Sequence, residues 1–531
     1  MERFSRLLDD LSTNPSRNSK LALMAGYFLD APDTDRGWAL VALTDGVPVK
    51  IAFRRVLTEI MDARIDPFLY KVSRDYVGDT AETVALLWPD AGCLPSAGAG
   101  PSLSAVVDEL HAASPASLAR VMAQLLDDCD VTQRWALLKF LGGALRVGVS
   151  GRLARLALAQ AHNRDVGEIE EVWHAVSPPY VELFAWLEGR AARPSTDGIP
   201  VFRPPMLATP IEEGDWAGLG PSDFAAEWKW DGIRVQIAAV GGAVRIYSRT
   251  GEDMSPAFPE LALAFLGMDV TADGELLVVR DGIVAPFNDV QQRLNRKAVS
   301  ARQIAKYPSH VRLYDLLLAG SEDLRGLAFD ERRVRLEQWH RANAPPLTDV
   351  SELIPFTDLA ELAQLHSSAR SAAIEGLMLK RRSSPYLAGR PKGHWFKWKR
   401  AALTLDCVLM YAQRGSGKRS SFYSDYTFGV WQTGTTGERQ LVPVGKAYSG
   451  FTDAELKELD RFIRQNTVET FGPVRAVKPE LVLEVAFDAV QRSARHKSGV
   501  AMRFPRIHRI RWDKPAADAD TLANVEALIP I

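Results

Sequence analysis

The sequence predicts a multi-domain chain with an all-α N-terminal domain, an α+β central domain and a β-barrel C-terminal domain. The three segments differ in how their apolar residues are spaced. Residues 1–195 carry Leu and Ala every three or four positions, which is the period of an amphipathic helix. Residues 205–400 mix short β-type runs with helical stretches. Residues 401–531 alternate strand-like runs with turn residues, which is typical of a small barrel.

The boundaries between these segments follow from local composition. Residues 189–210 read GRAARPSTDGIPVFRPPMLATP and contain five prolines, as expected of an extended connection between domains. In the last segment, DAELKELDRFIRQ has helical spacing and predicts one helix inserted among the strands. We therefore expect domains at 1–195, 205–400 and 401–531.

Composition limits the class of protein without identifying it. The 531 residues include 64 Lys and Arg against 66 Asp and Glu, so the net charge of −2 neither favours nor excludes a nucleic-acid partner. Three widely spaced cysteines cannot form a four-cysteine zinc site, and they fit a reducing compartment. The N-terminus lacks a signal-type apolar core, and no stretch approaches 18 consecutive apolar residues. We expect a cytoplasmic protein without a membrane span.

Six short motifs follow one another in the central segment. The first, EWKWDGIRVQ, places Lys229 in an apolar run that ends at Asp231-Gly232. Taken alone, Lys-x-Asp-Gly is weak, because a solvated surface lysine is the common case. The motifs that follow are SRTGE at 248–252, DGEL at 273–276, YD at 314–315, EGLMLK at 375–380 and WFKWK at 395–399. On a strand, the last of these places Lys397 and Lys399 on one face.

This ordered set resembles the covalent nucleotidyltransferase superfamily of ATP-dependent DNA ligases and mRNA capping enzymes, and it is most similar to the DNA ligases. The resemblance extends to SSPYLAGR ahead of WFKWK and to SARHKSG and RFPRIHRIRWDK near the C-terminus. In the helical segment, LRVGVSGRLA is similar to the DNA-binding domain of larger ATP-dependent ligases. The resemblance implies a nucleotidyltransferase (ATP-grasp-like) central domain and an OB-fold C-terminal domain.

The chemistry of the family explains the central lysine. A lysine amine attacks the α-phosphate of ATP, expels pyrophosphate and stores the bond energy as a lysyl phosphoramidate. A free lysine is protonated at neutral pH, so burial or nearby cations must activate it. The resemblance identifies Lys229 as this nucleophile. Asp231-Gly232 is expected to form a tight turn that holds the strand end against the nucleotide.

The resemblance also assigns residues to the adenosine. It implies that Glu227 and Arg234 contact the adenosine and that Arg249 reaches the ribose or a phosphate of the nicked strand. Tyr314 is expected to stack on adenine through its aromatic face. The alternative for Tyr314 is an ordinary aromatic residue in the core.

The phosphates are assigned to carboxylates and lysines. Glu275 and Glu375 are expected to hold Mg²⁺ or Mn²⁺ through their hard oxygen ligands, although either could instead bind ribose hydroxyls. Lys397 and Lys399 would neutralise the α-phosphate in the transition state. Arg390 is expected to assist, but the family pattern often has a second basic residue where this chain has Pro391.

The C-terminal segment carries a further basic motif. Arg511-x-Asp513-Lys514 matches the family motif that orients the pyrophosphate of ATP during self-adenylation, which assigns Arg511 and Lys514 to ATP. Arg503 belongs to the same basic run and is expected to contact DNA. The alternative is a solvated basic face.

The helical segment is assigned to DNA. Lys139, Arg146 and Arg152 surround a Gly-rich turn between helices, where basic side chains and helix N-termini suit phosphate contacts that do not depend on base sequence. A helical core with incidental surface charge is the alternative.

These observations predict an ATP-dependent DNA ligase that seals nicks in duplex DNA through lysyl-AMP, AMP transfer to the 5′-phosphate and attack by the 3′-hydroxyl. We expect a monomer that acts on nicked double-stranded DNA in repair, recombination or replication. An RNA ligase or capping-type guanylyltransferase and a non-catalytic DNA-end-binding protein are the alternatives. NAD⁺-dependent ligases are disfavoured because the cysteines are too few for their zinc module.

Overall fold

The computed structural model describes most of the chain. The described residues are 1–44, 46–89, 100–143, 145–294, 296, 298–368, 373–415, 423–434, 437–448, 452–493 and 496–529. They form two compact units. One unit contains 1–16, 45–148 and 401–531, and the other contains 17–44 and 149–400. The domain boundaries expected from the sequence stay a prediction.

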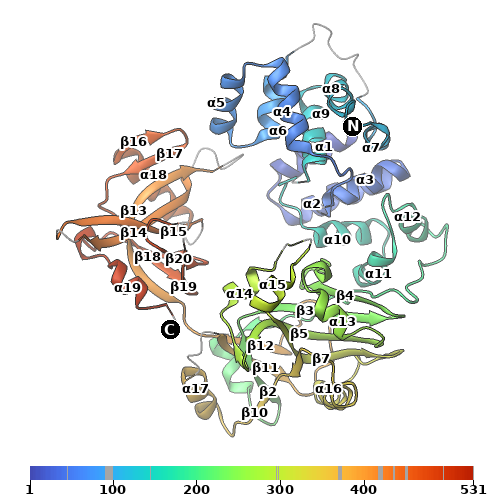
Figure 1. Cartoon of the computed structure of the whole chain (residues 1–531), viewed down its shortest axis with the longest axis vertical. Helices are drawn as coiled ribbons and strands as arrows, with labels where there is room; N and C mark the ends of the chain where they lie inside the picture. The colour runs from blue at the N-terminus through green and yellow to red at the C-terminus, as the bar shows by residue number, and fades with distance from the viewer. Residues whose placement is uncertain are drawn as a thin grey trace. The chain divides into compact units, whose positions relative to one another are not determined.

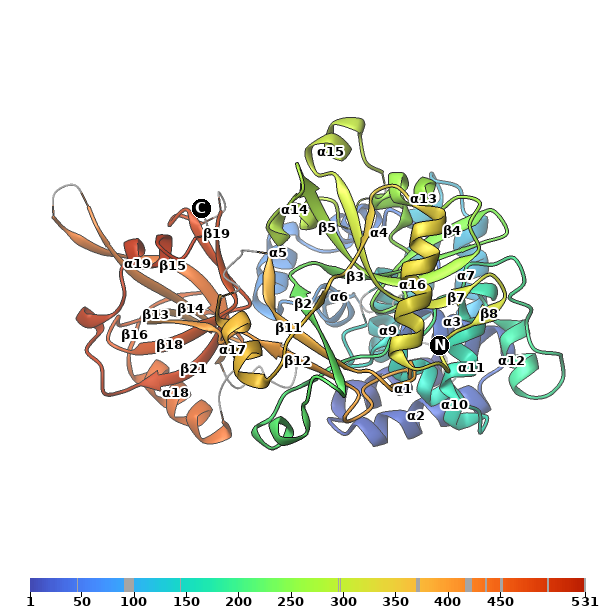
Figure 2. The same cartoon turned by 90° about the horizontal axis from the view of Figure 1, so that it is seen from below.

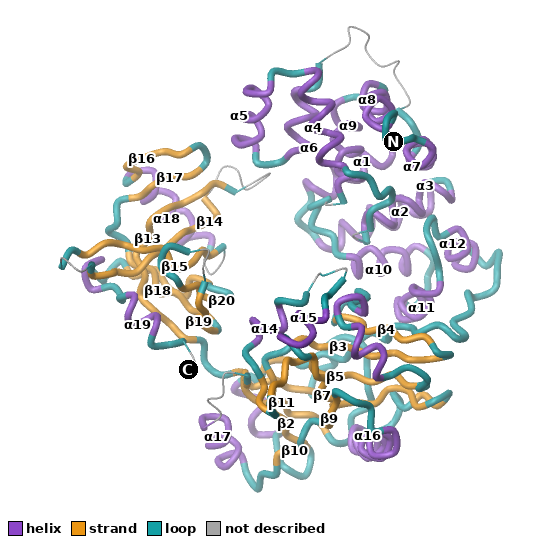
Figure 3. Tube along the Cα trace, in the orientation of Figure 1, coloured by secondary structure: helices purple, strands orange, loops and turns teal. Residues whose placement is uncertain are grey.

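The N-terminal region is helical, as predicted, and Figure 3 shows helices joined by loops there. Its helices in the first unit are α1 (Glu2–Thr13), α4 (Phe53–Arg64), α5 (Pro67–Val77), α6 (Thr80–Leu87), α7 (Leu103–Ala112), α8 (Leu118–Asp127) and α9 (Val131–Gly142). Those in the second unit are α2 (Arg17–Asp30), α3 (Asp33–Leu43), α10 (Gly151–Ala161), α11 (Val166–Val172), the 3₁₀ helix η1 (Trp173–Ala175) and α12 (Val181–Leu187).

Local signals set the ends of the central helix α9. The Asp130 carboxylate accepts a hydrogen bond from the backbone N–H of Gln133, and the Gln133 side-chain oxygen accepts one from the backbone N–H of Asp130, so the first turn has a complete capping box. At the other end Gly143 takes φ 68°, the left-handed conformation that terminates helices. The Gly-rich turn of the sequence is therefore a helix terminus.

The central segment contains two sheets, both in the second unit (Figure 1). In spatial order the first holds β1 (Thr209–Pro210), β12 (Trp395–Lys399), β11 (Ile374–Arg381), β2 (Phe224–Trp230) and β10 (Leu353–Ile354). The second holds β4 (Ala243–Ser248), β3 (Ile233–Val240), β5 (Val270–Arg280), β7 (Ser309–Ala319) and β8 (Glu322–Asp323), with β6 (Ile283–Val284) on β5 and β9 (Thr348–Val350) on β7. The helical elements of the central segment are η2 (Glu213–Gly218), η3 (Ser255–Ala257), α13 (Pro259–Ala264), α14 (Phe287–Gln291), α15 (Ala301–Lys306), α16 (Phe329–Asn343) and α17 (Leu359–Ser368).

The register of the first sheet separates an apolar face from a polar one. Cross-strand partners on β2, β11 and β12 form three rows, which are Ala225–Lys380–Trp395, Glu227–Met378–Lys397 and Lys229–Gly376–Lys399. The alternate residues, such as Phe224, Leu377 and Phe396, point to the other face and pack in a hydrophobic cluster that includes Leu362 of α17. Period-two alternation therefore gathers the charged residues of three motifs on one face.

The second sheet is covered by α16, which lies against β7 (Figure 2). Arg332 of α16 binds Asp315 of β7 through two hydrogen bonds of 2.8 and 2.9 Å, and both side chains are almost wholly buried. Arg332 also donates to the backbone carbonyls of Leu327 and Ser384. This pair anchors the helix to the sheet.

The C-terminal segment is strand-rich, and β13 organises it. One edge of β13 pairs with β14, while the other pairs with β18 near its start and β17 near its end. The strands are β13 (Leu403–Arg414), β14 (Tyr423–Thr433), β15 (Arg439–Ala447), β16 (Thr467–Phe471), β17 (Val474–Val477), β18 (Val482–Phe487), β19 (Ala489–Arg492), β20 (Val500–Arg503) and β21 (Arg506–Arg511). The helices are α18 (Asp453–Gln465), η5 (Ala516–Asp518) and α19 (Leu522–Glu526).

The inserted helix is confirmed, because α18 covers DAELKELDRFIRQ. A capping box between Thr452 and Glu455 starts α18, and Leu459 and Ile463 enter the core formed by the strands. Across the described parts of the chain, no helix has both the length and the apolarity needed to cross a membrane.

Removing the buried cation of the Arg332–Asp315 pair is expected to destabilise the second unit strongly. Arg332→Met leaves Asp315 charged and buried without its partner, so the free energy of unfolding should fall by roughly 3–5 kcal/mol. Urea unfolding measures this change. Arg335→Met on the same helix is the matched control, because Arg335 pairs with Glu322 at the surface and should change the free energy by less than about 0.5 kcal/mol. Equal effects of the two substitutions would contradict the anchoring role.

Candidate active site

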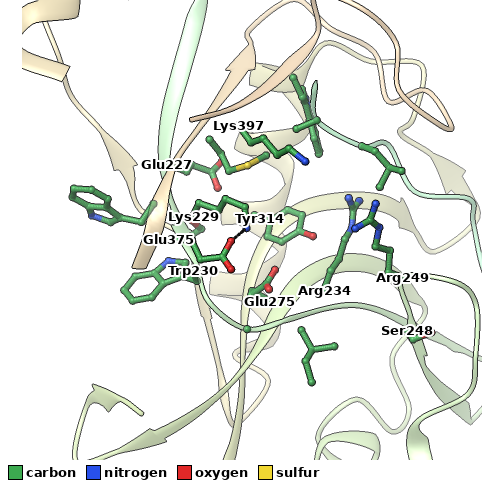
Figure 4. Close-up of a pocket in the computed structure, with 18 of the residues that line it drawn as sticks. Glu227, Lys229, Trp230, Arg234, Ser248, Arg249, Glu275, Tyr314, Glu375 and Lys397 are labelled. Carbon is green, nitrogen blue, oxygen red and sulfur yellow. Dashed lines mark hydrogen bonds and ion pairs between the residues drawn. The ribbon is translucent and has the colours of Figure 1, made fainter. Parts of the chain in front are cut away.

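A cavity of about 590 Å³ is lined by residues of both central sheets. Every central-segment residue that the sequence assigned to nucleotide or metal lines it, namely Glu227, Lys229, Arg234, Arg249, Glu275, Tyr314, Glu375, Arg390, Lys397 and Lys399. Figure 4 shows most of these side chains converging on one space. The fold therefore brings together residues that are up to 172 positions apart in the chain.

Lys229 is the penultimate residue of β2 and points into this cavity (Figure 4). Its side chain is about one-fifth exposed, and its ammonium group forms an ion pair with Glu375 of β11. Lys399 of β12 binds the same Glu375 oxygen at 3.1 Å. Burial acts to raise the pKa of Glu375, but the two ammonium groups outweigh it and lower this pKa to about 2. Glu375 is therefore ionised and shared between two lysines.

An irregularity in β11 places Glu375. The pairing with β2 shifts between Ile374 and Gly376, so Glu375 lies in a bulge. Gly376 adopts φ 145°, and a Cβ atom there would lie 2.0 Å from the backbone oxygen of Trp398 on β12. Only glycine allows this approach, which holds β12 and its lysines beside the bulge.

The turn at Asp231-Gly232 joins the two sheets at the cavity wall, because β2 ends at Trp230 and β3 begins at Ile233. A Cβ atom at Gly232 would lie 2.7 Å from the backbone oxygen of Leu276 and 2.8 Å from Cγ of Glu275. The glycine thus allows the turn to approach β5 closely.

The environment of Glu275 changes its pKa. Burial raises this pKa to about 7, the nearby Glu375 and Asp231 add to the rise, and Lys229 and Arg234 oppose it.

Glu227 lies one row further from the turn and is buried. Its Oε1 accepts a hydrogen bond of 2.9 Å from Lys380 of β11, which is also buried. Tyr314 of β7 lies across the cavity, with the Lys380 ammonium 4.5 Å from its ring centre. Lys380 was not assigned a role from the sequence, although it ends the EGLMLK motif.

Arg234 is held mainly by the protein. Its guanidinium donates to the Met206 carbonyl at 2.5 Å, to Asp273 at 2.6 Å and to the Tyr386 hydroxyl at 3.0 Å. It lies 5.7 Å from the ring centre of Tyr314. The guanidinium therefore supports the aromatic wall, and its direct contact with adenosine stays a prediction.

The remaining cations crowd the cavity mouth. Burial lowers the pKa of Lys397, and Arg390 and Lys399 lower it further. Burial also lowers the pKa of Arg249, as do Arg234 and Arg390. Seven basic and four acidic side chains line the cavity, an excess of three positive charges. A polyanion would relieve this repulsion, so the cavity favours a phosphate-bearing ligand.

The carboxylates fit a small hard cation. Glu375 adds to the rise in the pKa of Glu275 that burial causes, because the two like charges repel each other. Within the described ranges, no group of three or more His, Cys, Asp or Glu side chains is placed to hold a metal ion. Glu275 and Glu375 both line the cavity, and their hard oxygen atoms are the type of ligand that a Mg²⁺ or Mn²⁺ ion would use.

One wall of the cavity is braced from behind. The guanidinium of Arg312 lies 4.3 Å from the ring centre of Trp230 and binds Asp349 through hydrogen bonds of 2.6 and 2.9 Å. Burial acts to raise the pKa of Asp349, but hydrogen bonds from Arg312 and His310 outweigh it and lower this pKa to about 2. The ionised carboxylate thus fixes the arginine under the tryptophan that follows Lys229.

Arg511 and Lys514 belong to the other unit, where both approach Asp406 of β13. Lys514 donates to Asp406 Oδ2 at 2.7 Å, and Nη1 of Arg511 lies 3.4 Å from the same oxygen. Asp513 binds the opposite side of the Arg511 guanidinium at 2.8 and 2.9 Å. The two basic residues of the Arg-x-Asp-Lys motif therefore share one acidic partner that the sequence did not indicate.

The residues assigned to DNA occupy different environments. Lys139 is buried in an ion pair with Asp79, and Arg152 lies 3.3 Å from Glu170. Arg146 is exposed in a left-handed backbone conformation with φ 53°, and Arg503 ends β20 beside the Phe504 ring. Their DNA contacts stay predictions. Residues 494 and 495 of the SARHKSG motif lie outside the described residues.

The cavity combines an excess of positive charge with Lys229, a lysine held against the ionised Glu375, and these groups define a site for a phosphate-bearing ligand. Comparison with known families gives two matches. Residues 205–399 match the family described as "ATP dependent DNA ligase domain", and residues 419–514 match "ATP dependent DNA ligase C terminal region". The first match spans both central sheets.

Relatives that match about three-quarters of the chain agree with these family matches. A protein named "Probable DNA ligase" from Koribacter versatilis is 36% identical over 78% of this chain and 75% of its own length. A protein named "DNA ligase" from Archaeoglobus fulgidus is 32% identical over 74% of this chain and 70% of its own length. A solved structure named "Pmar-Lig_Pre." shares the fold at a TM-score of 0.56 and 16% identity, over 96% of this chain and 99% of its own. The chain belongs to the ATP-dependent DNA ligase family.

Adding a methyl group at Gly376 is expected to separate β11 from β12. Gly376→Ala places Cβ against the Trp398 carbonyl and requires a left-handed backbone, so stability should fall by about 1–3 kcal/mol. Because β12 carries Lys397 and Lys399, labelling of the protein by α-labelled ATP should fall as well. Thermal unfolding and a labelling time course measure the two effects. Gly214→Ala in η2 is the control, because a Cβ atom at Gly214 meets nothing within 4 Å. If the Gly376→Ala protein took up label as fully as wild type, the predicted separation of β11 and β12 would be contradicted.

The Asp349–Arg312 pair predicts a pH dependence of stability. The pKa of Asp349 in the folded protein, about 2, lies below the ordinary value of about 3.9 in an unfolded chain. Its contribution is therefore present above about pH 4 and is lost as the pH falls toward 2. Asp349→Asn should lower the melting temperature at pH 7 and reduce its loss between pH 4 and pH 2. An equal fall in melting temperature between pH 4 and pH 2 for wild type and Asp349→Asn would contradict this prediction.

Proposed function

We propose that this chain seals nicks in duplex DNA and that Lys229 carries AMP as the covalent intermediate. The observation that supports this most is the ammonium group of Lys229, which enters a positively charged cavity and is paired with the ionised Glu375. Membership of the ATP-dependent DNA ligase family supplies the co-substrate.

The first step follows from the groups around Lys229. The ammonium group of Lys229 must pass one proton to solvent water and separate from Glu375, and Glu375 then retains Lys399 as its partner. As the Lys229 nitrogen forms its bond to the α-phosphorus, the bond from phosphorus to the bridging oxygen breaks and pyrophosphate departs. Lys397 and Lys399 face the same side and offset the negative charge of the transition state. A Mg²⁺ or Mn²⁺ ion held by Glu275 and Glu375 would supply further positive charge at the phosphates.

The adenosine occupies the inner part of the cavity in this proposal. The carboxylate of Glu227 accepts a hydrogen bond from the amino group of adenine, and Tyr314 stacks on the base. Arg234 fixes Tyr314, while Arg249 and the exposed Arg390 reach the ribose and phosphates. Figure 4 shows Arg234 and Arg249 side by side, beyond Tyr314 as seen from Lys229.

The other parts of the chain serve the later steps. The strand-rich segment, proposed as an OB-fold at 401–531, brings Arg511 and Lys514 to the pyrophosphate of ATP. The helical segment at 1–195 contacts the DNA backbone through Lys139, Arg146 and Arg152, and Arg503 adds a contact from β20. AMP passes from Lys229 in the 205–400 segment to the 5′-phosphate, and the 3′-hydroxyl then displaces it. The enzyme would work as a monomer in repair, recombination or replication of DNA.

Labelling the purified chain with α-labelled ATP tests this proposal. Label should appear on the wild-type protein, resist denaturation and be discharged by nicked duplex DNA with formation of a sealed strand. Lys229→Ala should take up no label, and Lys397→Ala should slow labelling by about 100-fold through the loss of one transition-state cation. Lys392→Ala, on the exposed loop before β12, is the matched control and should label normally.

Each alternative has its own outcome. Label from GTP and not from ATP would indicate a capping-type guanylyltransferase, and discharge by nicked RNA alone would indicate an RNA ligase. No label from either nucleotide would overturn the proposal and leave a DNA-binding protein.

A further inference from the structure

A fourth lysine, Lys380, lines the cavity and is not used in any step proposed so far. Lys380 and Glu227 form an ion pair of 2.9 Å in which the side chains are 2% and 3% exposed. Two charges this deeply buried lose most of their hydration, and only their mutual attraction and hydrogen bonding offset that loss. A pair at this depth is therefore expected to serve a purpose besides stability.

Aromatic rings surround the ammonium of Lys380. Its Nζ lies 4.5 Å from the ring centre of Tyr314, 4.7 Å from that of Trp395 and 5.1 Å from that of Phe329. Such faces attract a cation but accept few directed hydrogen bonds. Glu227 is then the side chain that fixes where the ammonium points, and the ammonium in turn fixes Glu227. Burial lowers the pKa of Lys380, and Glu227 and Asp315 oppose that shift.

The sheet register makes this arrangement rigid. Glu227 is opposite Met378 and Lys380 is opposite Ala225, so the two charged residues are diagonal neighbours on the cavity face of β2 and β11. Lys380 donates a hydrogen bond to Oε1 of Glu227, and the Glu227 side chain also lines the cavity beside Tyr314. A base stacked on Tyr314 would present its edge to the remaining oxygen of a carboxylate that cannot turn away.

We propose that Lys380 is a positioning residue that determines purine selectivity by holding the Glu227 carboxylate as a fixed acceptor. This inference rests on the proposed function. Adenine offers an amino group at its position 6, which donates to a carboxylate. Guanine has a carbonyl oxygen at that position, and two acceptors facing each other in a dry site repel.

The same chemistry explains why a cation is needed. A buried carboxyl without a cation turns to another partner or takes up a proton. A protonated carboxyl can donate as well as accept, so it would tolerate the carbonyl of guanine. The ammonium group of Lys380 is the cation that keeps Glu227 in place. The selectivity for adenine then depends on a residue that need not contact the nucleotide.

The test compares three triphosphates on the full-length chain. They are α-labelled ATP, GTP and the purine riboside triphosphate that has hydrogen at position 6, and the measured quantity is kcat/KM for self-labelling. In wild type, ATP should exceed the purine riboside triphosphate by at least about 10-fold, the value of one hydrogen bond to a charged group. Lys380→Met should lower kcat/KM for ATP by about that factor, mainly through KM, and change the purine riboside triphosphate by less than about 3-fold.

Further variants keep the inference open to refutation. Lys380→Arg keeps the charge and should retain part of the selectivity, and it provides the answer if Lys380→Met does not fold. Glu227→Gln with Lys380→Met replaces both charges and should give the same low selectivity as Lys380→Met alone, since the two residues act as one. Lys392→Met is the surface control and should match wild type for all three triphosphates.

The failures are distinguishable. An equal loss with all three triphosphates would reduce Lys380 to a structural residue, and unchanged ratios in both Lys380 variants would remove it from base selection. Either result leaves the proposed function intact if wild type labels with ATP and passes the label to nicked DNA. Absence of label on wild type would instead overturn the proposed function itself.

Discussion

The register among β2, β11 and β12 is the constraint on which the rest of the site depends. It aligns a lysine, a glycine and a second lysine across three strands in one row, and Glu227 and Lys397 in the next. A slip of one residue in any strand would turn its charged side chains into the apolar cluster beneath α17. The burial of Phe224, Leu377 and Phe396 therefore holds the charged residues in the cavity. In this sheet the hydrophobic effect determines where the reactive groups lie.

Two glycines let the backbone come close enough for this register to form a cavity. At Gly376 a strand carbonyl occupies the space of a side chain, and at Gly232 the edge of β5 does so. The first brings the lysines of β12 beside the Glu375 bulge, and the second brings Glu275 toward Lys229. Charges that would be screened at the surface are thus close together and partly removed from water, where electrostatic interactions are stronger.

The sequence identified the residues of the site better than it identified their partners. Period two in WFKWK predicted that Lys397 and Lys399 share one face of a strand, because that feature depends on local geometry alone. The helical N-terminal region and α18 were predicted from the helical spacing of their apolar residues. The partner of Lys139 is Asp79, 60 positions away, and that of Lys514 is Asp406, 108 positions away. Such ion pairs depend on tertiary packing, which no local pattern records.

Arg511 and Lys514 share the carboxylate of Asp406, and this affects how the C-terminal segment would release a pyrophosphate group in the proposed function. Arg511 and Lys514 already have oxygen acceptors in the absence of nucleotide. Binding a pyrophosphate group would exchange one set of oxygens for another, with little change in the number of charge-assisted hydrogen bonds. The free-energy change of such an exchange would be close to zero, so the pyrophosphate group would bind and dissociate readily. The proposed function, in which Arg511 and Lys514 hold the pyrophosphate of ATP only during the first step, would need reversibility of this kind.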